Sequence, residues 1–340
     1  MTLEEIRIRQ LQGQYLISPG GANDVVRGLC GLQAQFLSNA AHALRIRCGG
    51  DALPEDMVKG WTLRGTMHVF HAGDLPLFLH HGRKVKLRPC DTLAGDAQVS
   101  EARKRYFAEV ILERIAAGEN ARDQLKAACT ARGMTETEAE SLFNPWGGLI
   151  RALCEAGRIC CIPQEKKLYR LCPPFAPMEA GAARLELLRR YFAHYGPATI
   201  RDAAYFFGWT QTEIRACLPQ LPVGAADCEG KTYYFMDAPY AAAEMPRCIF
   251  LAGFDPLLMG HEKTESLFLP HEHLRGIFNL AGIVMPPVML DGRIVGKWKR
   301  TGNKLAVTLF EDISEAGRAE IRSCAQELWP ELRKIEFLET

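Results

Sequence analysis

The stretch Leu29-Cys30-Gly31-Leu32-Gln33-Ala34-Gln35-Phe36 lies where one helical pattern stops and the next one starts. Two glutamines are separated there by a single small apolar residue. Because side chains alternate along an extended backbone, Gln33 and Gln35 are expected to point the same way. Each carries a carbonyl acceptor and an amide donor without charge, so the pair can hold a water molecule or the edge of a base. The alternative interpretation is a polar helix end.

The segments around this stretch predict helices followed by a small hairpin. Thr2 with Glu5 has the spacing of a capping box, which favours a helix to about Leu16. The other helices expected are a short one capped by Asn23 and residues 37–47, 54–59 and 74–80, with strands at 61–63 and 67–70 around 64–66. Helices followed by a two-stranded wing are typical of a winged helix, a relative of the helix-turn-helix.

The same succession recurs twice along the chain. In the second copy, helices are expected at 101–116, after Asn120, after the capping box of Thr135 and Glu138, and from Asn144-Pro145 to 157, with a hairpin at 158–162 and 167–171. In the third, they are expected at 179–194, at 199–208 and at 210–218, opened by Thr199 with Asp202 and by Thr210 with Glu213, before strands at 222–226 and 232–235.

The last hundred residues follow a different pattern. Strands are expected at 248–251, 288–290, 294–298, 305–310 and 335–338, with a helix at 314–328. The Asp291-Gly292 turn between two of these strands is a strong hairpin signal, and together they predict a small mixed sheet. The predicted fold is thus mainly α with small β wings (α+β), divided into units at 1–98, 99–176, 177–245 and 246–340.

Length and composition set the class of protein. A chain of 340 residues, 48% hydrophobic and 24% charged, is expected to form two or more globular domains. No apolar run is long enough to span a bilayer. The acidic N-terminus, Met1-Thr2-Leu3-Glu4-Glu5-Ile6, does not resemble a signal peptide. We therefore expect a cytoplasmic protein without membrane partners.

The twelve cysteines contain no Cys-x-x-Cys spacing, and only Cys160-Cys161 are adjacent. The histidines at 80–81 and 271–273 also lack the spacing of metal ligands on a helix face. We expect buried free thiols in a reducing compartment, no metal site and no cofactor.

Charge is informative only locally, because the net charge is +1. Arg83-Lys84-Val85-Lys86-Leu87-Arg88 holds four cations in six residues, and Lys297-Trp298-Lys299-Arg300 holds three around an aromatic side chain. Such clusters suit a phosphate backbone. The alternative for each cluster is a solvated face, and Trp298 is expected in the core because it alternates with lysines on a strand.

Four segments together resemble one known family. Gly31-Leu32-Gln33-Ala34-Gln35, Trp61-Thr62-Leu63-Arg64-Gly65-Thr66-Met67-His68, Phe254-Asp255-Pro256-Leu257-Leu258 and the hairpin 290–298 are similar, in that order, to segments of the AlkZ/YcaQ family of bacterial winged-helix DNA glycosylases. The resemblance implies three tandem winged-helix units in a C-shaped arrangement, a C-terminal β element and double-stranded DNA in the concave face. It also implies excision of N7-alkylated guanine and, in some members, unhooking of interstrand crosslinks.

The family's catalytic motif of Gln, an aliphatic residue and Gln falls on Gln33 and Gln35, whereas a sister branch carries Asp at the second position. One departure is Gly260-His261-Glu262-Lys263-Thr264, where members often carry an aromatic residue and an Asp-Arg pair. Lys263 would replace that arginine as a point charge that cannot form bidentate hydrogen bonds. The alkyl adduct that the protein prefers therefore stays open.

The chemistry restricts the substrate. Glycoside hydrolases use two carboxylates, and two amides cannot take their place as acid and base. An N7-alkylguanine is already cationic and leaves as a neutral base, so positioning a water is the task that remains. The prediction is therefore a monofunctional glycosylase that uses water rather than a lysine Schiff base. Asp255 is a candidate electrostatic helper, with capping of a turn before Pro256 as its alternative.

Residues expected to contact DNA lie on the first wing, in the two basic clusters and after Gly260. They are Arg64, Thr66, His68, Arg83, Lys84, Lys86, Arg88, Lys263, Lys297, Lys299 and Arg300; the alternative for His68 is a satisfied, half-buried strand residue. The expected partner is duplex DNA containing alkylated purines, bound by a monomer at the bacterial nucleoid. The competing hypothesis is a non-catalytic winged-helix regulator, which would usually be a dimer on two half-sites.

Overall fold

A computed structural model describes residues 1–50, 52–83, 85, 99–144, 148–236 and 242–339. The chain forms two compact units. The first unit comprises Met1–Gln33, Ser38–Leu53 and Leu187–Thr340, and the second comprises Ala34–Leu37 and Pro54–Glu186. The boundary between them therefore passes through the glutamine motif.

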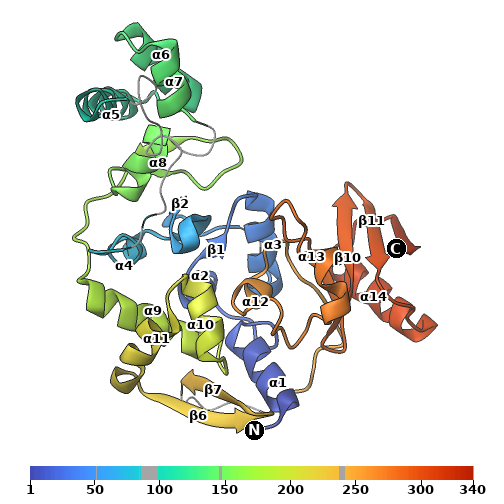
Figure 1. The fold of residues 1–340 in the computed structure, drawn as a ribbon. Coiled ribbons are helices and arrows are strands. Elements are labelled where there is room, and N and C mark those ends of the chain that lie inside the picture. Colours follow the sequence, from blue (N-terminus) through green and yellow to red (C-terminus); the bar gives the residue numbers. More distant parts are fainter. Residues whose placement is uncertain (51, 84, 86–98, 145–147, 237–241, 340) are drawn as a thin grey trace. The chain divides into compact units, whose positions relative to one another are not determined.

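Helices dominate the first unit (Figure 1). They are α1 (Leu3–Gly13), α2 (Ala22–Gly28), α3 (Leu37–Cys48), the second half of α9 (Ala180–His194), α10 (Ile200–Phe207), α11 (Gln211–Cys217), α12 (Pro256–Met259), α13 (Leu274–Ile277) and α14 (Glu315–Leu328). A two-residue strand, β1 (Leu32–Gln33), carries the first glutamine, and β6 (Val223–Cys228) pairs with β7 (Lys231–Met236) as an antiparallel hairpin.

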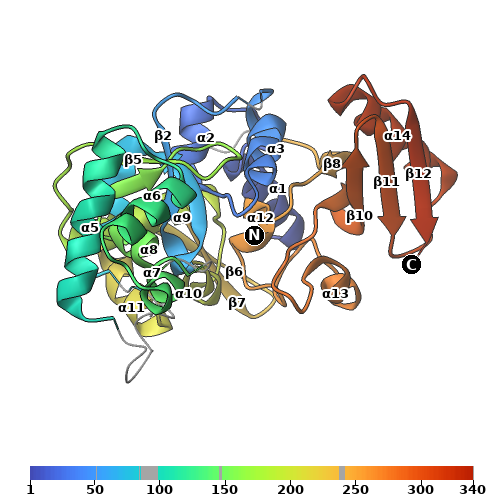
Figure 2. The same cartoon turned by 90° about the horizontal axis from the view of Figure 1, so that it is seen from above.

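A five-stranded C-terminal sheet has the strand order β12-β11-β10-β9-β8. Its strands are β8 (Cys248–Phe250), β9 (Pro287–Leu290), β10 (Arg293–Thr301), β11 (Lys304–Leu309) and β12 (Lys334–Glu339). The β11–β12 pair is parallel and the others are antiparallel, so the predicted mixed sheet is confirmed. Helix α14 lies against one face (Figure 2), where Ile321 and Ala325 pack against Val295 and Val307.

The second unit is built on a sheet that joins two wings. Strands β3 (Met67–His71), β2 (Met57–Trp61), β4 (Ile159–Cys161) and β5 (Tyr169–Leu171) follow one another in that order. Lys59 of β2 is the register partner of Cys161 of β4. The hairpins predicted as separate first and second wings thus form one sheet, which sequence periodicity does not reveal.

The helices of this unit are α4 (Leu75–Phe78), α5 (Glu101–Ala116), α6 (Arg122–Ala131), α7 (Glu136–Leu142) and α8 (Gly148–Glu155). Phe107, Ile111 and Leu125 are fully buried in the core that α5 and α6 share with the sheet.

Most of the predicted elements are present. The capping boxes at Thr2, Thr135, Thr199 and Thr210 all form, because each threonine hydroxyl accepts the amide of the acidic residue three positions later while that carboxylate accepts the threonine amide. The predicted fold class is confirmed: helices combined with small, mostly antiparallel sheets.

Some predicted elements are wrong. Residues 54–59 are not helical; Met57–Trp61 forms β2, because its backbone pairs with β3 and β4 on both sides. The caps of α2 and α6 are Gly21 and Ala121 rather than Asn23 and Asn120. Leu63–Gly65 is a 3-10 turn instead of the end of a strand and the start of a loop.

The helix start at Pro145 lies outside the described residues, as do the cations Lys84, Lys86 and Arg88. The four predicted unit boundaries and the tandem winged-helix arrangement stay predictions. They are drawn from the order of helices and strands along the sequence, whereas the two compact units are defined by contacts in space. Among the described residues, no helix is long and apolar enough to cross a membrane.

Candidate functional site

Two consecutive residues in the left-handed region lead the chain into the glutamine motif. Cys30 has a φ of 57° and Gly31 a φ of 84°, and the Gly31 amide donates to the carbonyl of Val26 at 2.8 Å. This turn ends α2 and starts β1. Gln33 is buried at 8% exposure, whereas Gln35 is exposed in the bend that follows the strand. The two amides therefore differ in solvent access, which strand alternation alone does not predict.

Gln35 opens onto a pocket of about 210 Å³ in the second unit. The amide of the preceding Ala34 donates to the carbonyl of Met67 at 2.8 Å, which fixes the backbone at the pocket edge. The lining residues come from the joined sheet, from α6 and α8 and from adjoining loops: Gln35, Lys59, Trp61, Met67, Arg122, Asn144, Ile150, Cys161, Ile162, Gln164, Lys167 and Tyr169.

Gln35 is the one residue of this pocket that the sequence motifs marked as a candidate site residue. Most of the other lining residues come from two hairpins about a hundred positions apart, which the β2–β4 pairing brings together, and Arg122 and Ile150 come from α6 and α8. The signal that could have found Lys59 is its place on a strand, which the predicted helix at 54–59 concealed.

Lys59 is the most enclosed cation of the pocket, at 8% exposure. Burial lowers the pKa of its ammonium, with repulsion from Lys167 acting in the same direction and Cys161 and Glu165 opposing it. The amine therefore loses its proton more readily than an exposed lysine does.

On the first wing, His68 fits the alternative of a satisfied strand residue better than that of a DNA contact. His68 is 3% exposed, and its Nδ1 lies 2.9 Å from Thr62 Oγ1 and 3.2 Å from the carbonyl oxygen of Thr66. Burial, followed by the charge of Arg64, lowers the pKa of His68 to about 3. His68 is thus a neutral, satisfied strand residue, and its burial conflicts with direct contact to DNA.

The other wing residues lie nearer the surface. Arg64 is partly exposed in the 3-10 turn with a φ of 54°. The Thr66 hydroxyl donates to the carbonyl of Leu63 at 3.1 Å. In the basic cluster that follows, Arg83 is partly buried and donates to the carbonyl of Glu155. Contact of these residues with DNA stays a prediction.

Asp255 is completely buried in the first unit. Its carboxylate accepts from both terminal nitrogens of Arg47, at 2.7 and 3.2 Å, and from the amides of Ala252 and Leu257 at 3.1 and 3.0 Å. Asp255 is also the N-cap of α12. These contacts support the capping alternative, and the helper role stays a prediction.

The C-terminal basic cluster lies on β10. The indole nitrogen of Trp298 donates to the carbonyl of Leu251 at 2.8 Å and the ring packs against the sheet core, which confirms the expected core position. Lys297 lies 5.9 Å from the centre of the Phe310 ring. Arg300 pairs with Glu331, and Lys299 is exposed.

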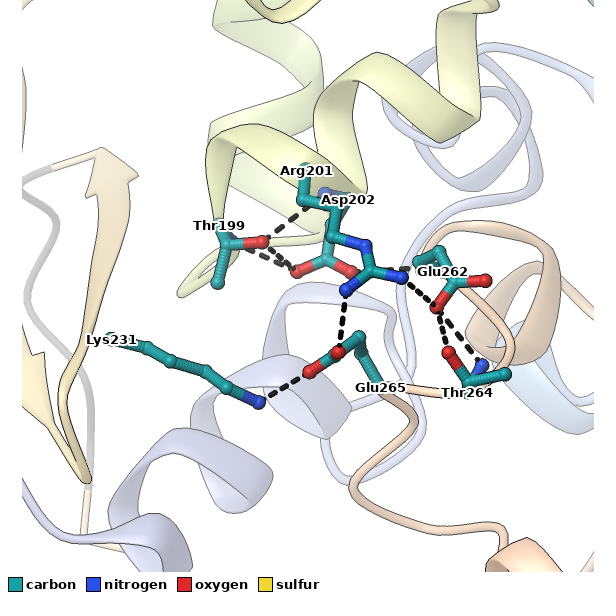
Figure 3. A network of polar contacts seen from close by, with 7 residues as sticks. All are labelled: Thr199, Arg201, Asp202, Lys231, Glu262, Thr264 and Glu265. Carbon is teal, nitrogen blue, oxygen red and sulfur yellow. Dashed lines mark hydrogen bonds and ion pairs between the residues drawn. The ribbon is translucent and has the colours of Figure 1, made fainter.

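A polar network holds the segment after Gly260 (Figure 3). Arg201 of α10 contacts Glu265 at 2.8 Å and Glu262 at 3.3 Å, and the Asp202 carboxylate accepts the Glu262 amide at 2.9 Å. Lys231 of β7 also pairs with Glu265. Lys263 lies between these anchored residues and is exposed.

Within the described ranges, no group of three His, Cys, Asp or Glu side chains is arranged to hold a metal ion. The described cysteines are free thiols, each buried or partly buried.

Comparisons with known proteins identify the family. The model of the "DNA glycosylase AlkZ-like" family matches residues 26–329. An interstrand DNA cross-link repair glycosylase of Streptomyces sahachiroi is 27% identical over 341 aligned positions, covering 89% of each chain. The solved structure of Streptomyces sahachiroi DNA glycosylase AlkZ superposes with a TM-score of 0.79 and 22% identity over all of both chains, which shows a shared fold. The chain belongs to the AlkZ-like family of DNA glycosylases.

Proposed function

We propose that this glycosylase hydrolyses the N-glycosidic bond of N7-alkylguanine in duplex DNA, including guanine crosslinked between strands, and leaves an abasic site. Membership of the family supports the reaction class. The similar protein of Streptomyces sahachiroi is named for the repair of interstrand crosslinks, and this supports the proposal that a crosslinked guanine is also a substrate.

The position of Gln35 at the pocket is the main support for the proposal. Gln35 is exposed at the edge of a pocket whose lining, in the described part of the chain, includes three neutral amides and no carboxylate. Such a site offers no pair of acids for general acid–base hydrolysis. It can orient a water molecule through amide oxygens, which accept hydrogen bonds without taking a proton.

The N7-alkylated base supplies what the site lacks. Its positive charge makes it a good leaving group that departs neutral, so no proton donor is required. The water attacks C1′ of the sugar as positive charge develops there, and the Gln33 and Gln35 oxygens orient it. Its proton passes to solvent. Ordinary guanine, which carries no charge, should not be excised.

Base release tests the proposal directly. Duplex DNA with a single N7-methylguanine is incubated with the wild type and with Gln33→Ala and Gln35→Ala, and abasic sites are cleaved with alkali. We expect release by the wild type and a loss of at least about a hundredfold in Gln35→Ala, because orientation of the water is worth several kcal/mol of barrier.

Gln220→Ala, which removes an exposed glutamine from the 3-10 turn after α11, is the matched control and should keep wild-type activity. The same assay on an N7–N7 interstrand crosslink tests the bulky substrate separately. If the wild type releases no base from either DNA, the proposal is wrong and a DNA-binding role without chemistry remains.

A further inference from the structure

We infer that the pocket beside Gln35 binds a phosphate of the DNA backbone, and that the damaged base is not inserted into it. The inference deepens the proposed function, because it states which part of the substrate the pocket holds. It rests on the charges, the burial and the aromatic contacts of the lining residues.

The charge of the pocket lining favours a phosphate over a cationic base. Lys59, Arg122 and Lys167 line the pocket together, and among the described residues none of them forms an ion pair with a carboxylate. Glu165 is exposed and is not part of the lining. A cationic N7-alkylguanine entering such a pocket would be repelled, whereas a phosphate would be attracted.

The two aromatic side chains of the lining, Trp61 and Tyr169, pack against the core of the second unit. Enzymes that extrude a base stack it between aromatic or apolar side chains. Here the Arg151 guanidinium lies 5.8 Å from the centre of the Trp61 ring and is held by Glu155 at 2.9 Å. Tyr169 is only 4% exposed and belongs to the core. Trp61 is partly buried against the same core with the Arg151 cation over its ring, so at most one face of one aromatic side chain remains for a base.

The hydrogen-bond donors of the lining complete the match. Lysine and arginine side chains carry donors only, and the side-chain amides of Gln35 and Gln164 each add an NH₂ group. A phosphate oxygen can accept from groups of this kind; one terminal nitrogen of Arg122 already donates to the carbonyl of Phe143, and the guanidinium carries further donors. Lys59 gains a counter-ion on binding, which offsets the cost of its burial.

A phosphate bound in this pocket determines where the sugar and the damaged base lie during the reaction. A phosphate held by the three cations fixes the attached sugar close to Gln35, while the damaged base stays outside the pocket. A guanine tied to the opposite strand can then be attacked without being extruded. The phosphate charge also lies near the sugar on which positive charge develops, which stabilises that state.

The binding experiment uses duplex DNA with a central tetrahydrofuran, an abasic analogue that cannot be cleaved. Affinity is measured between about 50 and 200 mM salt for the wild type, Lys59→Gln, Lys167→Gln and Lys166→Gln. Lys166 is exposed, adjacent in sequence and absent from the pocket lining, so its variant changes net charge equally and serves as the matched control.

We expect Lys59→Gln and Lys167→Gln to weaken binding on the order of tenfold at low salt. Each should also reduce the slope of log K against log salt by about one relative to Lys166→Gln. If both variants bind with the affinity and slope of the control, the phosphate assignment is overturned. Lys167 is exposed, so its variant keeps the test valid should Lys59→Gln fail to fold.

A second arm identifies the phosphate. Single phosphates flanking the tetrahydrofuran are replaced in turn by neutral methylphosphonates. One position should weaken wild-type binding about tenfold and weaken Lys167→Gln clearly less, because only two of the three cations remain to lose their contact. Equal losses in both proteins at every position would contradict the inference. Because no base is released in either arm, the outcome does not depend on whether the proposed hydrolysis is found.

Discussion

At the scale of single residues, burial decides which of the predicted polar side chains can meet DNA. His68 and Asp255 were singled out by their chemistry, yet the folded chain encloses both. Each is satisfied by partners within its own unit. Mutation of such an enclosed group is expected to change the stability of the fold. For a titratable group, this contribution to stability depends on pH.

His68 predicts a measurable loss of stability in acid. Its folded pKa of about 3 lies below the value of about 6.5 expected in the unfolded chain. Between these values only the unfolded chain binds the proton, so the free energy of unfolding falls as the pH falls, by about 1.4 kcal/mol per pH unit. Above about pH 6.5 the contribution is complete.

Urea denaturation of the second unit, which contains His68, measures this contribution in the wild type and His68→Asn at pH 7 and pH 5. The wild type should lose about 2 kcal/mol more than the variant over that interval. The other histidines with lowered pKa, such as His42 and His194, are present in both proteins and cancel. Equal losses would show that His68 is protonated in the folded protein.

At the scale of elements, the turn before β1 positions the glutamines. Gly31 adopts a φ of 84°, where a side chain costs about 1–2 kcal/mol. Gly31→Ala should therefore lower stability by about that amount. It should also lower kcat, because strain in this turn displaces the strand that carries Gln33 and the bend that carries Gln35.

Gly49→Ala is the matched control, since Gly49 has a φ of 79° and no atom lies within 4 Å of an added Cβ. It should lose similar stability and keep wild-type kcat for release of N7-methylguanine. Should both variants lose kcat to the same extent, the turn at Gly31 would have no special part in positioning the motif.

At the scale of the whole molecule, two compact units make a single cooperative transition unexpected. Calorimetry should resolve two transitions. Asp255→Asn leaves the buried Arg47 charge without its partner, at a cost of about 3–5 kcal/mol, and should lower the transition of the first unit. Phe107→Ala, in the core of the second unit, should lower the other by a similar energy.

One transition that shifts in both variants would show that the units unfold together. The Asp255→Asn variant also tests the helper role: kcat is measured well below its first transition. A large loss of kcat in the folded variant would support an electrostatic contribution to the reaction.

The sequence by itself determined the local elements. Capping boxes, the Gly208 stop of α10 and the Asp291-Gly292 hairpin are interactions between residues a few positions apart, so their spacing predicts them. The sequence also indicated Gln33 and Gln35 as candidate site residues, because the two glutamines lie within one short motif. The helix predicted at 54–59 failed because the partners of β2 come from distant positions.

Only the tertiary structure decided what surrounds the motif. The β2–β4 pairing and the packing of α6 place Lys59, Lys167 and Arg122 in one pocket with Gln35, and burial removes His68 from the surface. These outcomes depend on contacts between residues far apart in the chain and on the exclusion of water from cores. Periodicity and spacing carry no record of either, since they describe only neighbours along the sequence.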